Sequence, residues 1–79
     1  MSIYHNRIEI NPDVMLGKPV IKGTRIPVEL IVRKLGEGAS ASDLLDGYPN
    51  LKKEDIQASL LYAADTLGNE LVVELKTGT

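Results

Sequence analysis

The spacing of apolar residues predicts three helices after residue 26. The first covers residues 27–35, where Val28, Leu30, Ile31 and Leu35 give one apolar face. Its leading proline suits the first helical position, because the missing amide proton would have no partner there. The cations Arg33 and Lys34 lie in the last turn, where they complement the helix dipole. Gly36 then ends the helix.

A shorter second helix is predicted over residues 41–46, burying Leu44 and Leu45. Ser40 and Asp43 have the spacing of a capping box, in which each side chain accepts a hydrogen bond from the other residue's amide. A glycine ends this helix, and the proline two positions later disfavours helical geometry in the residue before it.

The third and longest helix is predicted over residues 52–67. Apolar residues at helical spacing should form its inward stripe, made of Ile56, Leu60, Ala63 and Leu67. A Gly-Asn pair is expected to close this helix. Residues 70–75, rich in Val and Leu, are compatible with a strand, a helix extension or a loose tail, and we favour the strand.

The residues before the first helix predict a short, irregular β-hairpin. Residues 7–10 alternate polar and apolar side chains, as a half-buried strand does, and a turn follows at Asn11-Pro12-Asp13. A single helical turn is expected at 13–16, after which Gly17 can supply a positive φ. A second extended segment, 19–21, then leads into a tight turn. Because two such strands are unstable alone, we expect the hairpin to lie across the helices.

These elements define a mainly α protein with a three-helix, helix-turn-helix core, a short N-terminal β-hairpin and a C-terminal strand. With 79 residues we expect a single domain over 1–79, its core at about 7–67 and a tail or strand at 68–79. Apolar residues make up 43% and charged residues 25% of the chain, which is typical of a globular protein. There is no cysteine, no secretory signal pattern and no apolar run near the ~20 residues that span a bilayer. We therefore expect a cytoplasmic protein without membrane contact.

Charge is distributed unevenly along the chain. Six basic and three acidic residues precede residue 37, whereas three basic and eight acidic residues follow from there on. The basic front could attract a phosphate backbone or an acidic partner, and the acidic rear would repel nucleic acid. Ordinary solubility explains the same charges equally well.

A long motif resembles the hallmark of family 433 among the domains of unknown function. The matching residues are Gly17 to Val28, Gly38, Ser40, Leu44-Leu45, Tyr48 to Leu51, Glu54 to Ile56, Leu60 and Tyr62 to Ala64. The resemblance covers about residues 8–67 and implies a homeodomain-like helix-turn-helix fold. Family members are often labelled antitoxins, because they are associated with toxin ribonucleases of the PIN type.

The sequence departs from the family pattern at the start of the third helix. The family usually has Thr or Ser ahead of the acidic pair, where this chain has Lys52 and Lys53. Loss of a cap hydroxyl costs about 1 kcal/mol, and Asn50 could take its place as the cap. Alternatively the two lysines contact phosphate, although cations at a helix start oppose the dipole.

Base reading by the third helix is not favoured, because its outward side chains are acidic or apolar, namely Glu54, Asp55, Ala58, Leu61, Tyr62 and Asp65. The candidate contacts to double-stranded DNA are the cations and one glutamine: Lys18, Lys22, Arg25, Arg33, Lys34, Lys52, Lys53 and Gln57. Arg25 could instead fix its own loop by bonding carbonyls.

The outer face of the third helix better predicts a protein interface, for which the candidates are Ala58, Leu61, Tyr62 and Asp65. A second copy of the chain, giving a homodimer, or a protein partner would cover it. Contact with the hairpin of the same chain explains these residues equally well.

The sequence does not predict catalysis, and no metal or cofactor is expected. His5, the only histidine, lies near the terminus without ordered partners, and no cysteine or serine has the spacing of a catalytic nucleophile. The leading hypothesis is an antitoxin-like homodimer that blocks a toxin ribonuclease of PIN type and regulates its own operon by binding operator DNA. The alternative is a protein-interaction adaptor of the same fold with no DNA affinity.

Overall fold

The computed structural model describes the backbone of residues 6–78 and the side chains of residues 6–68. In chain order its elements are β1 (Ile8–Glu9), the 3-10 turn η2 (Met15–Gly17), β2 (Val20–Ile21), α1 (Val28–Gly36), α2 (Ala41–Gly47) and α3 (Lys53–Gly78). The expected class, mainly helical with three helices and a short antiparallel hairpin, is confirmed.

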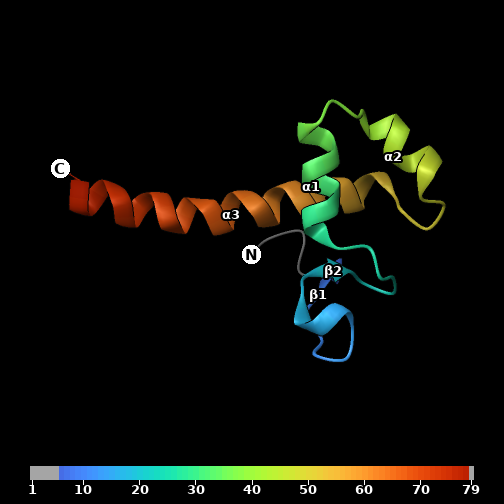
Figure 1. Ribbon diagram of the computed structural model, residues 1–79, viewed down its shortest axis with the longest axis horizontal. Helices are drawn as coiled ribbons and strands as arrows, with labels where there is room; N and C mark the ends of the chain where they lie inside the picture. The colour runs from blue at the N-terminus through green and yellow to red at the C-terminus, as the bar shows by residue number, and fades with distance from the viewer. Residues whose placement is uncertain (1–5, 79) are drawn as a thin grey trace.

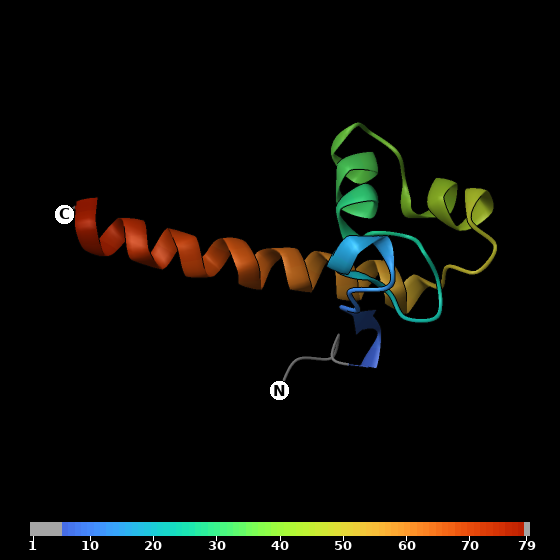
Figure 2. The same cartoon turned by 60° about the horizontal axis from the view of Figure 1, so that its bottom comes forward.

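The arrangement is centred on the crossing of α1 and α3 (Figures 1 and 2). In Figure 1, α2 lies at one end of α1 and the hairpin at the other, while α3 runs on past both. A helix of 26 residues is about 39 Å long, which accounts for the long axis of 46 Å against 30 and 23 Å for the other two.

The hydrophobic core draws one or two residues from each major element. Its buried members are Ile21, Ile31, Leu44, Leu51 and Ile56. Half-buried side chains, among them those of the strand β1 and of the turn before α3, pack against it. Strands of two residues cannot be stable alone, so the hairpin depends on this shared core.

The hairpin forms where it was expected, with Ile8 opposite Ile21 and Glu9 opposite Val20. Its tight turn is held by Thr24, whose hydroxyl donates to the Ile21 carbonyl at 2.7 Å and whose amide donates to the same oxygen at 3.0 Å. Gly23 in this turn has a φ of +81°, a conformation that L side chains rarely adopt.

The helical turn expected at residues 13–16 lies at 15–17 and is left-handed. Met15, Leu16 and Gly17 all have positive φ, of 51°, 58° and 83°. A preceding turn, in which the Val14 amide donates to the Asn11 carbonyl at 2.9 Å, occupies the start of the expected segment.

The starts of the first two helices confirm most of the sequence prediction. Pro27 is the residue before α1 rather than its first residue, because it forms a β-bridge with Val20 and is extended, with a ψ of 144°. At α2 the capping box is present: the Asp43 amide donates to the Ser40 hydroxyl at 3.0 Å, and the Ser40 amide donates to the Asp43 carboxylate at 2.9 Å.

The start of α3 is closed by Asp55 rather than by Asn50. The Lys52 amide donates to Asp55 Oδ2 at 3.0 Å, which is the carboxylate half of a capping box without the hydroxyl half. The carboxylate therefore makes up part of what the missing Thr or Ser would supply.

The strand predicted at residues 70–75 is wrong, because α3 continues as a helix to Gly78. Gly68 does not take the positive φ that would stop the helix. A helix satisfies its backbone hydrogen bonds internally, whereas a strand would need a partner edge. No helix within the described residues is long and apolar enough to cross a membrane.

The predicted inward stripe of α3 is also wrong in part. Ile56 is buried, but Leu60 is 44% and Leu67 is 62% exposed. Ala58 and Ser59, both fully buried, lie inside instead, and their small side chains suit a face that packs closely. The face of α3 that packs is therefore rotated from the one that its large apolar residues mark.

Candidate binding surfaces

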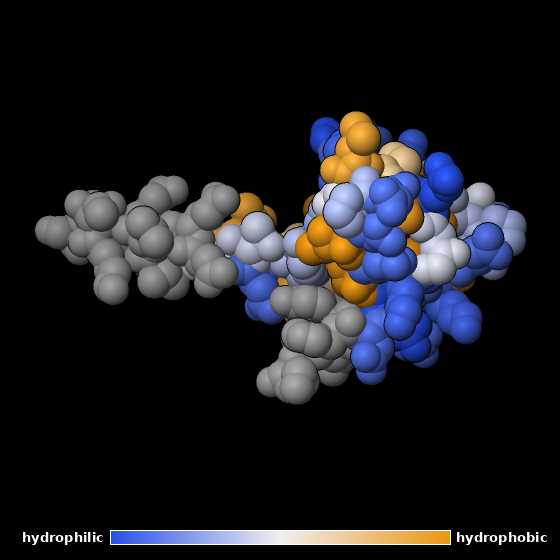
Figure 3. Space-filling view, turned by 90° about the horizontal axis from the view of Figure 1, so that it is seen from below, coloured by the Kyte–Doolittle hydropathy of each residue, from blue (hydrophilic) through white to orange (hydrophobic). Residues whose placement is uncertain are grey.

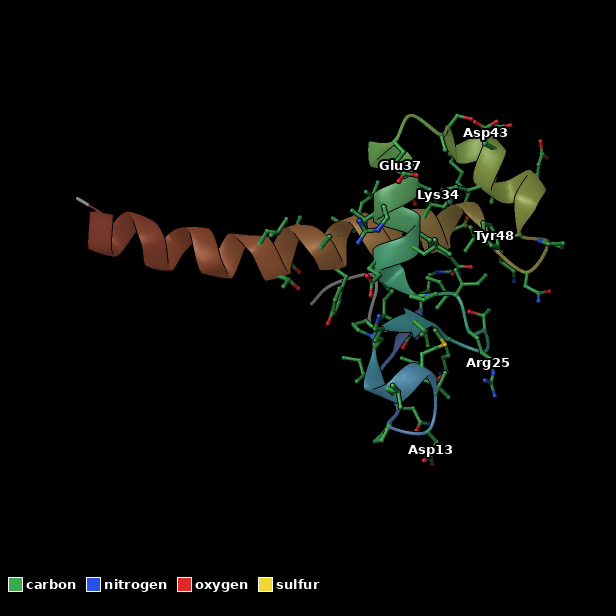
Figure 4. The ribbon with its side chains drawn as sticks, viewed as in Figure 1. Asp13, Arg25, Lys34, Glu37, Asp43 and Tyr48 are labelled. Carbon is green, nitrogen blue, oxygen red and sulfur yellow. The ribbon has the colours of Figure 1, made fainter. Side chains whose placement is uncertain are left out.

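The eight residues predicted to contact nucleic acid do not form one surface. Lys22 and Lys52 line a common hollow, whereas Lys18 and Arg33 both bind Glu29 elsewhere. The remaining four, Arg25, Lys34, Lys53 and Gln57, are exposed. Arg25 projects away from the body of the molecule in Figure 4, and no hydrogen bond ties its side chain to a described residue, so it does not fix its loop.

A polar hollow of about 350 Å³ lies between the hairpin turn and the start of α3. It is lined by Asn6, Arg7, Lys22, Gly23, Thr24, Asn50, Lys52 and Asp55. Three of these are cations that come from three distant segments of the chain. The sequence predicted Lys22 and Lys52 as binding residues but not Arg7. The position of Arg7 next to a strand gave no sign that it lies near the two lysines.

Asp55 forms the acidic floor of the polar hollow and is only 5% exposed. Its Oδ1 accepts a hydrogen bond from Arg7 Nη1 at 3.0 Å, and its Oδ2 accepts from the Lys52 amide at 3.0 Å. The prediction that Asp55 points outward is wrong, because Arg7 draws the carboxylate into the fold. Both of its oxygens accept hydrogen bonds from the same chain, and Arg7 balances the negative charge of this carboxylate.

A second, apolar groove of about 420 Å³ runs between α1 and α3. It is lined by Pro19, Val28, Glu29, Val32, Arg33, Tyr62, Ala63, Thr66 and Leu67. Figure 3 shows hydrophobic atoms exposed among hydrophilic ones on the underside of the body. No residue is common to the apolar groove and the polar hollow.

The rim of the apolar groove carries a small charge network. Lys18 Nζ lies 2.9 Å from one carboxylate oxygen of Glu29, and Arg33 Nη2 lies 3.6 Å from the other. The hydrogen bond and charge of Lys18, with a lesser contribution from Arg33, lower the pKa of Glu29 below 4.5. This network gives the rim a fixed pattern of charge at neutral pH.

The predicted protein interface is divided by the structure. Leu61 is 40% exposed, Asp65 is exposed, and Tyr62 lines the apolar groove. Ala58 cannot contact a partner, because it is fully buried in the fold. Sequence reasoning missed the exposed apolar residues of the N-terminal loops, of which Leu16 is 95% exposed.

The described residues contain no group of three or more His, Asp and Glu side chains placed to hold a metal ion. His5 lies outside the described residues.

The fold and these two surfaces define a small, mainly helical domain with a short antiparallel hairpin. The sequence model of the family described as protein of unknown function (DUF433) matches residues 8–63. The chain therefore belongs to the DUF433 family.

Relatives of known sequence and structure agree with this assignment. A crystal structure of a DUF433 member protein from Anabaena variabilis is 35% identical, with a TM-score of 0.73, over 91% of this chain and 70% of that one. Uncharacterized protein y4eO of Sinorhizobium fredii is 36% identical over 53 residues, which are 67% of this chain and 24% of that protein. An uncharacterized protein of Archaeoglobus fulgidus is 63% identical over 27 residues, which are 34% of this chain and 75% of that protein. The chain thus spans about a quarter of the length of y4eO.

Proposed function

We propose that this chain is an antitoxin-like binding protein that captures a toxin ribonuclease of PIN type in the groove between α1 and α3. The observation that carries the proposal is the groove itself, an open apolar channel beside the exposed Leu67. The toxin as partner comes from the resemblance of the sequence to a family labelled in this way. The proposal involves no catalysis, because its work is binding.

The composition of the apolar groove suits a segment of protein. Val32, Ala63 and Leu67 offer apolar contact, and Tyr62 adds an aromatic ring with a polar end. Grooves between helices take up amphipathic helices in several recognition systems. The charges of Glu29 and Arg33 at the rim would set the register of such a segment rather than supply most of the affinity.

Co-expression with the product of the neighbouring open reading frame tests the proposal. We expect the two proteins to co-purify and the growth defect caused by the partner to be relieved. Ala63→Arg fills the apolar groove and should weaken binding at least about tenfold, since a long charged side chain would take the place of apolar contacts. Ala64→Arg, the same change at the exposed neighbouring position, is the matched control. Equal binding by both variants would overturn the assignment to the groove, and failure to co-purify would overturn the toxin partner.

A protein-interaction adaptor is the second candidate. It is favoured by y4eO, in which a region similar to this chain makes up 24% of a longer protein, as an interaction module does. Capture of a partner through the apolar groove without any effect on growth would select the adaptor.

A homodimer is part of the proposal and has its own test. Leu61 and Asp65 lie one helical turn apart on the exposed side of α3. Leu61→Glu should lower the mass measured by light scattering, and an unchanged mass would remove this face as the contact.

Operator binding would need a further surface, because the exposed first turn of α3 carries Glu54 beside Lys53. Base readout calls for donors such as Arg, Lys, Asn or Gln along the helix, and Gln57 alone does not supply it. A gel-shift titration with upstream DNA at two salt concentrations tests this role. No shift at low salt would remove it.

A further inference from the structure

We propose that the polar hollow between the hairpin turn and the start of α3 binds a phosphate group. This site is separate from the proposed partner binding, because the polar hollow shares no residue with the apolar groove. The two proposals can therefore fail independently.

The charges of the polar hollow favour an anion. Arg7, Lys22 and Lys52 bring three positive charges together, against the single negative charge of Asp55. Arg7 is already paired with that carboxylate at 3.0 Å. Lys22 and Lys52 make no ion pair with any residue in the described part of the chain, so two cations of the lining have no counterion there.

A cation is a poor fit for the same space. Asp55 supplies the only carboxylate in the lining, and both of its oxygens already accept hydrogen bonds, from Arg7 and from the Lys52 amide. Divalent cations bind to several oxygen ligands, which the polar hollow does not offer. Its open donors, by contrast, match the oxygens of a phosphate.

Neutral donors supplement the two ammonium groups. The amide of Gly23 donates to no acceptor among residues 6–78, and the lack of a side chain leaves that backbone uncovered. Asn6 and Asn50, whose side chains carry amide donors, also line the polar hollow. The structure thus places donors from three loops around one volume, as phosphate sites in proteins do.

The phosphate can come from two sources, the backbone of a nucleic acid or a free phosphate compound. Lys22 and Lys52 are exposed, so a phosphate within a longer polymer can reach them. Titration of the ¹⁵N-labelled protein with inorganic phosphate, and separately with a short DNA duplex, distinguishes the sources. Amide shifts at Gly23 and Lys53 report occupation of the polar hollow.

The test compares two double variants with the same change in net charge. Lys22→Gln with Lys52→Gln removes both ammonium groups and should weaken binding about tenfold or more, since charge-assisted hydrogen bonds to the phosphate would be lost. Arg25→Gln with Lys34→Gln removes two exposed cations that do not line the polar hollow and should bind as the wild type does. All four side chains are exposed and none of them makes an ion pair with a described residue, so both variants should keep the wild-type unfolding midpoint.

The titrations distinguish a nucleic-acid backbone, a free phosphate compound and the absence of a phosphate site. Tighter binding of the duplex than of phosphate, lost in the Lys22 and Lys52 variant, assigns a nucleic-acid backbone to the site. Binding of phosphate alone, with the same loss, assigns a free phosphate compound. No shift at Gly23 with either probe, or equal weakening in both variants, would overturn the site.

Discussion

Arg7 and Asp55, which are 48 positions apart in the sequence, are joined by an ion pair of 3.0 Å between Arg7 Nη1 and Asp55 Oδ1. The other oxygen of the same carboxylate accepts the Lys52 amide. One buried side chain therefore ties the segment that leads into the hairpin to the first turn of the longest helix. Hydrogen bonds of this kind restrict the movement of both elements relative to each other.

Loss of this carboxylate should destabilise the fold. We expect Asp55→Ala to lower the free energy of unfolding by about 2 kcal/mol, because two hydrogen bonds disappear and one of them is charge-assisted. Glu54→Ala, an exposed acid in the same turn, should cost about 0.5 kcal/mol or less. Urea unfolding measures both values, and equal losses would contradict the role given to Asp55.

The burial of Ala58 leads to a second prediction. Ala58→Leu should destabilise the protein by about 1–3 kcal/mol, since extra methyl groups must enter a site that is fully buried. Ala64→Leu adds the same atoms at an exposed position of the same helix and should change stability little. Thermal unfolding of the two variants decides the matter. If Ala58→Leu is tolerated and also changes the oligomeric state, Ala58 belongs to an interface after all.

Two glycines should respond to alanine in opposite directions. Gly23→Ala should destabilise the protein by about 1 kcal/mol, because its φ of +81° is unfavourable for a side chain even though nothing lies within 4 Å of the added carbon. Gly36→Ala, in the last turn of α1 with open space around it, should stabilise by about 0.5–1 kcal/mol. Chemical denaturation of both variants checks the signs, which must differ.

The pKa of Glu29 should depend on its two ion-pair partners, Lys18 and Arg33. Its pKa in the folded protein lies below 4.5, so its contribution to stability is present above pH 4.5 and is lost as the pH falls through the lowered value. Lys18→Gln should raise the pKa of Glu29 toward 4.5, and Arg33→Gln should raise it less, because Lys18 is the larger cause. NMR titration of the Glu29 carboxyl carbon measures this pKa in the wild type and in the two variants. A larger effect from Arg33 would show that the geometry at the rim differs in solution.

The sequence predicted the helices and the hairpin of this fold better than it predicted which face of α3 is buried. Local signals such as the Ser40–Asp43 capping box act over three residues, and the hairpin follows an alternation of neighbours, so both are readable from the chain. The buried face of α3 depends on which helix crosses it. The small residues Ala58 and Ser59 lie on that buried face, and no count of large apolar residues along α3 reveals it.

The polar hollow was predictable only in part, because it too depends on contacts between distant segments of the chain. Sequence reasoning could mark Lys22 and Lys52 as available cations, since both flank turns. Which cations meet is decided by the pairing of β1 with β2, which brings Arg7 to the side of Lys22, where the Lys22 amide donates to the Arg7 carbonyl at 2.8 Å. Likewise Lys18 and Arg33, two of the predicted contacts to DNA, bind Glu29 away from the polar hollow, through contacts that only the folded chain defines.

The core that joins Ile21, Ile31 and Ile56 has a consequence for synthesis of the protein on the ribosome. A nascent chain that ends before Ile56 has the hairpin and α1 but lacks the helix against which both pack. Its exposed apolar side chains would have no native cover until that part of α3 has left the exit tunnel. We therefore expect these elements to fold only after Ile56 has emerged, as one cooperative step rather than element by element.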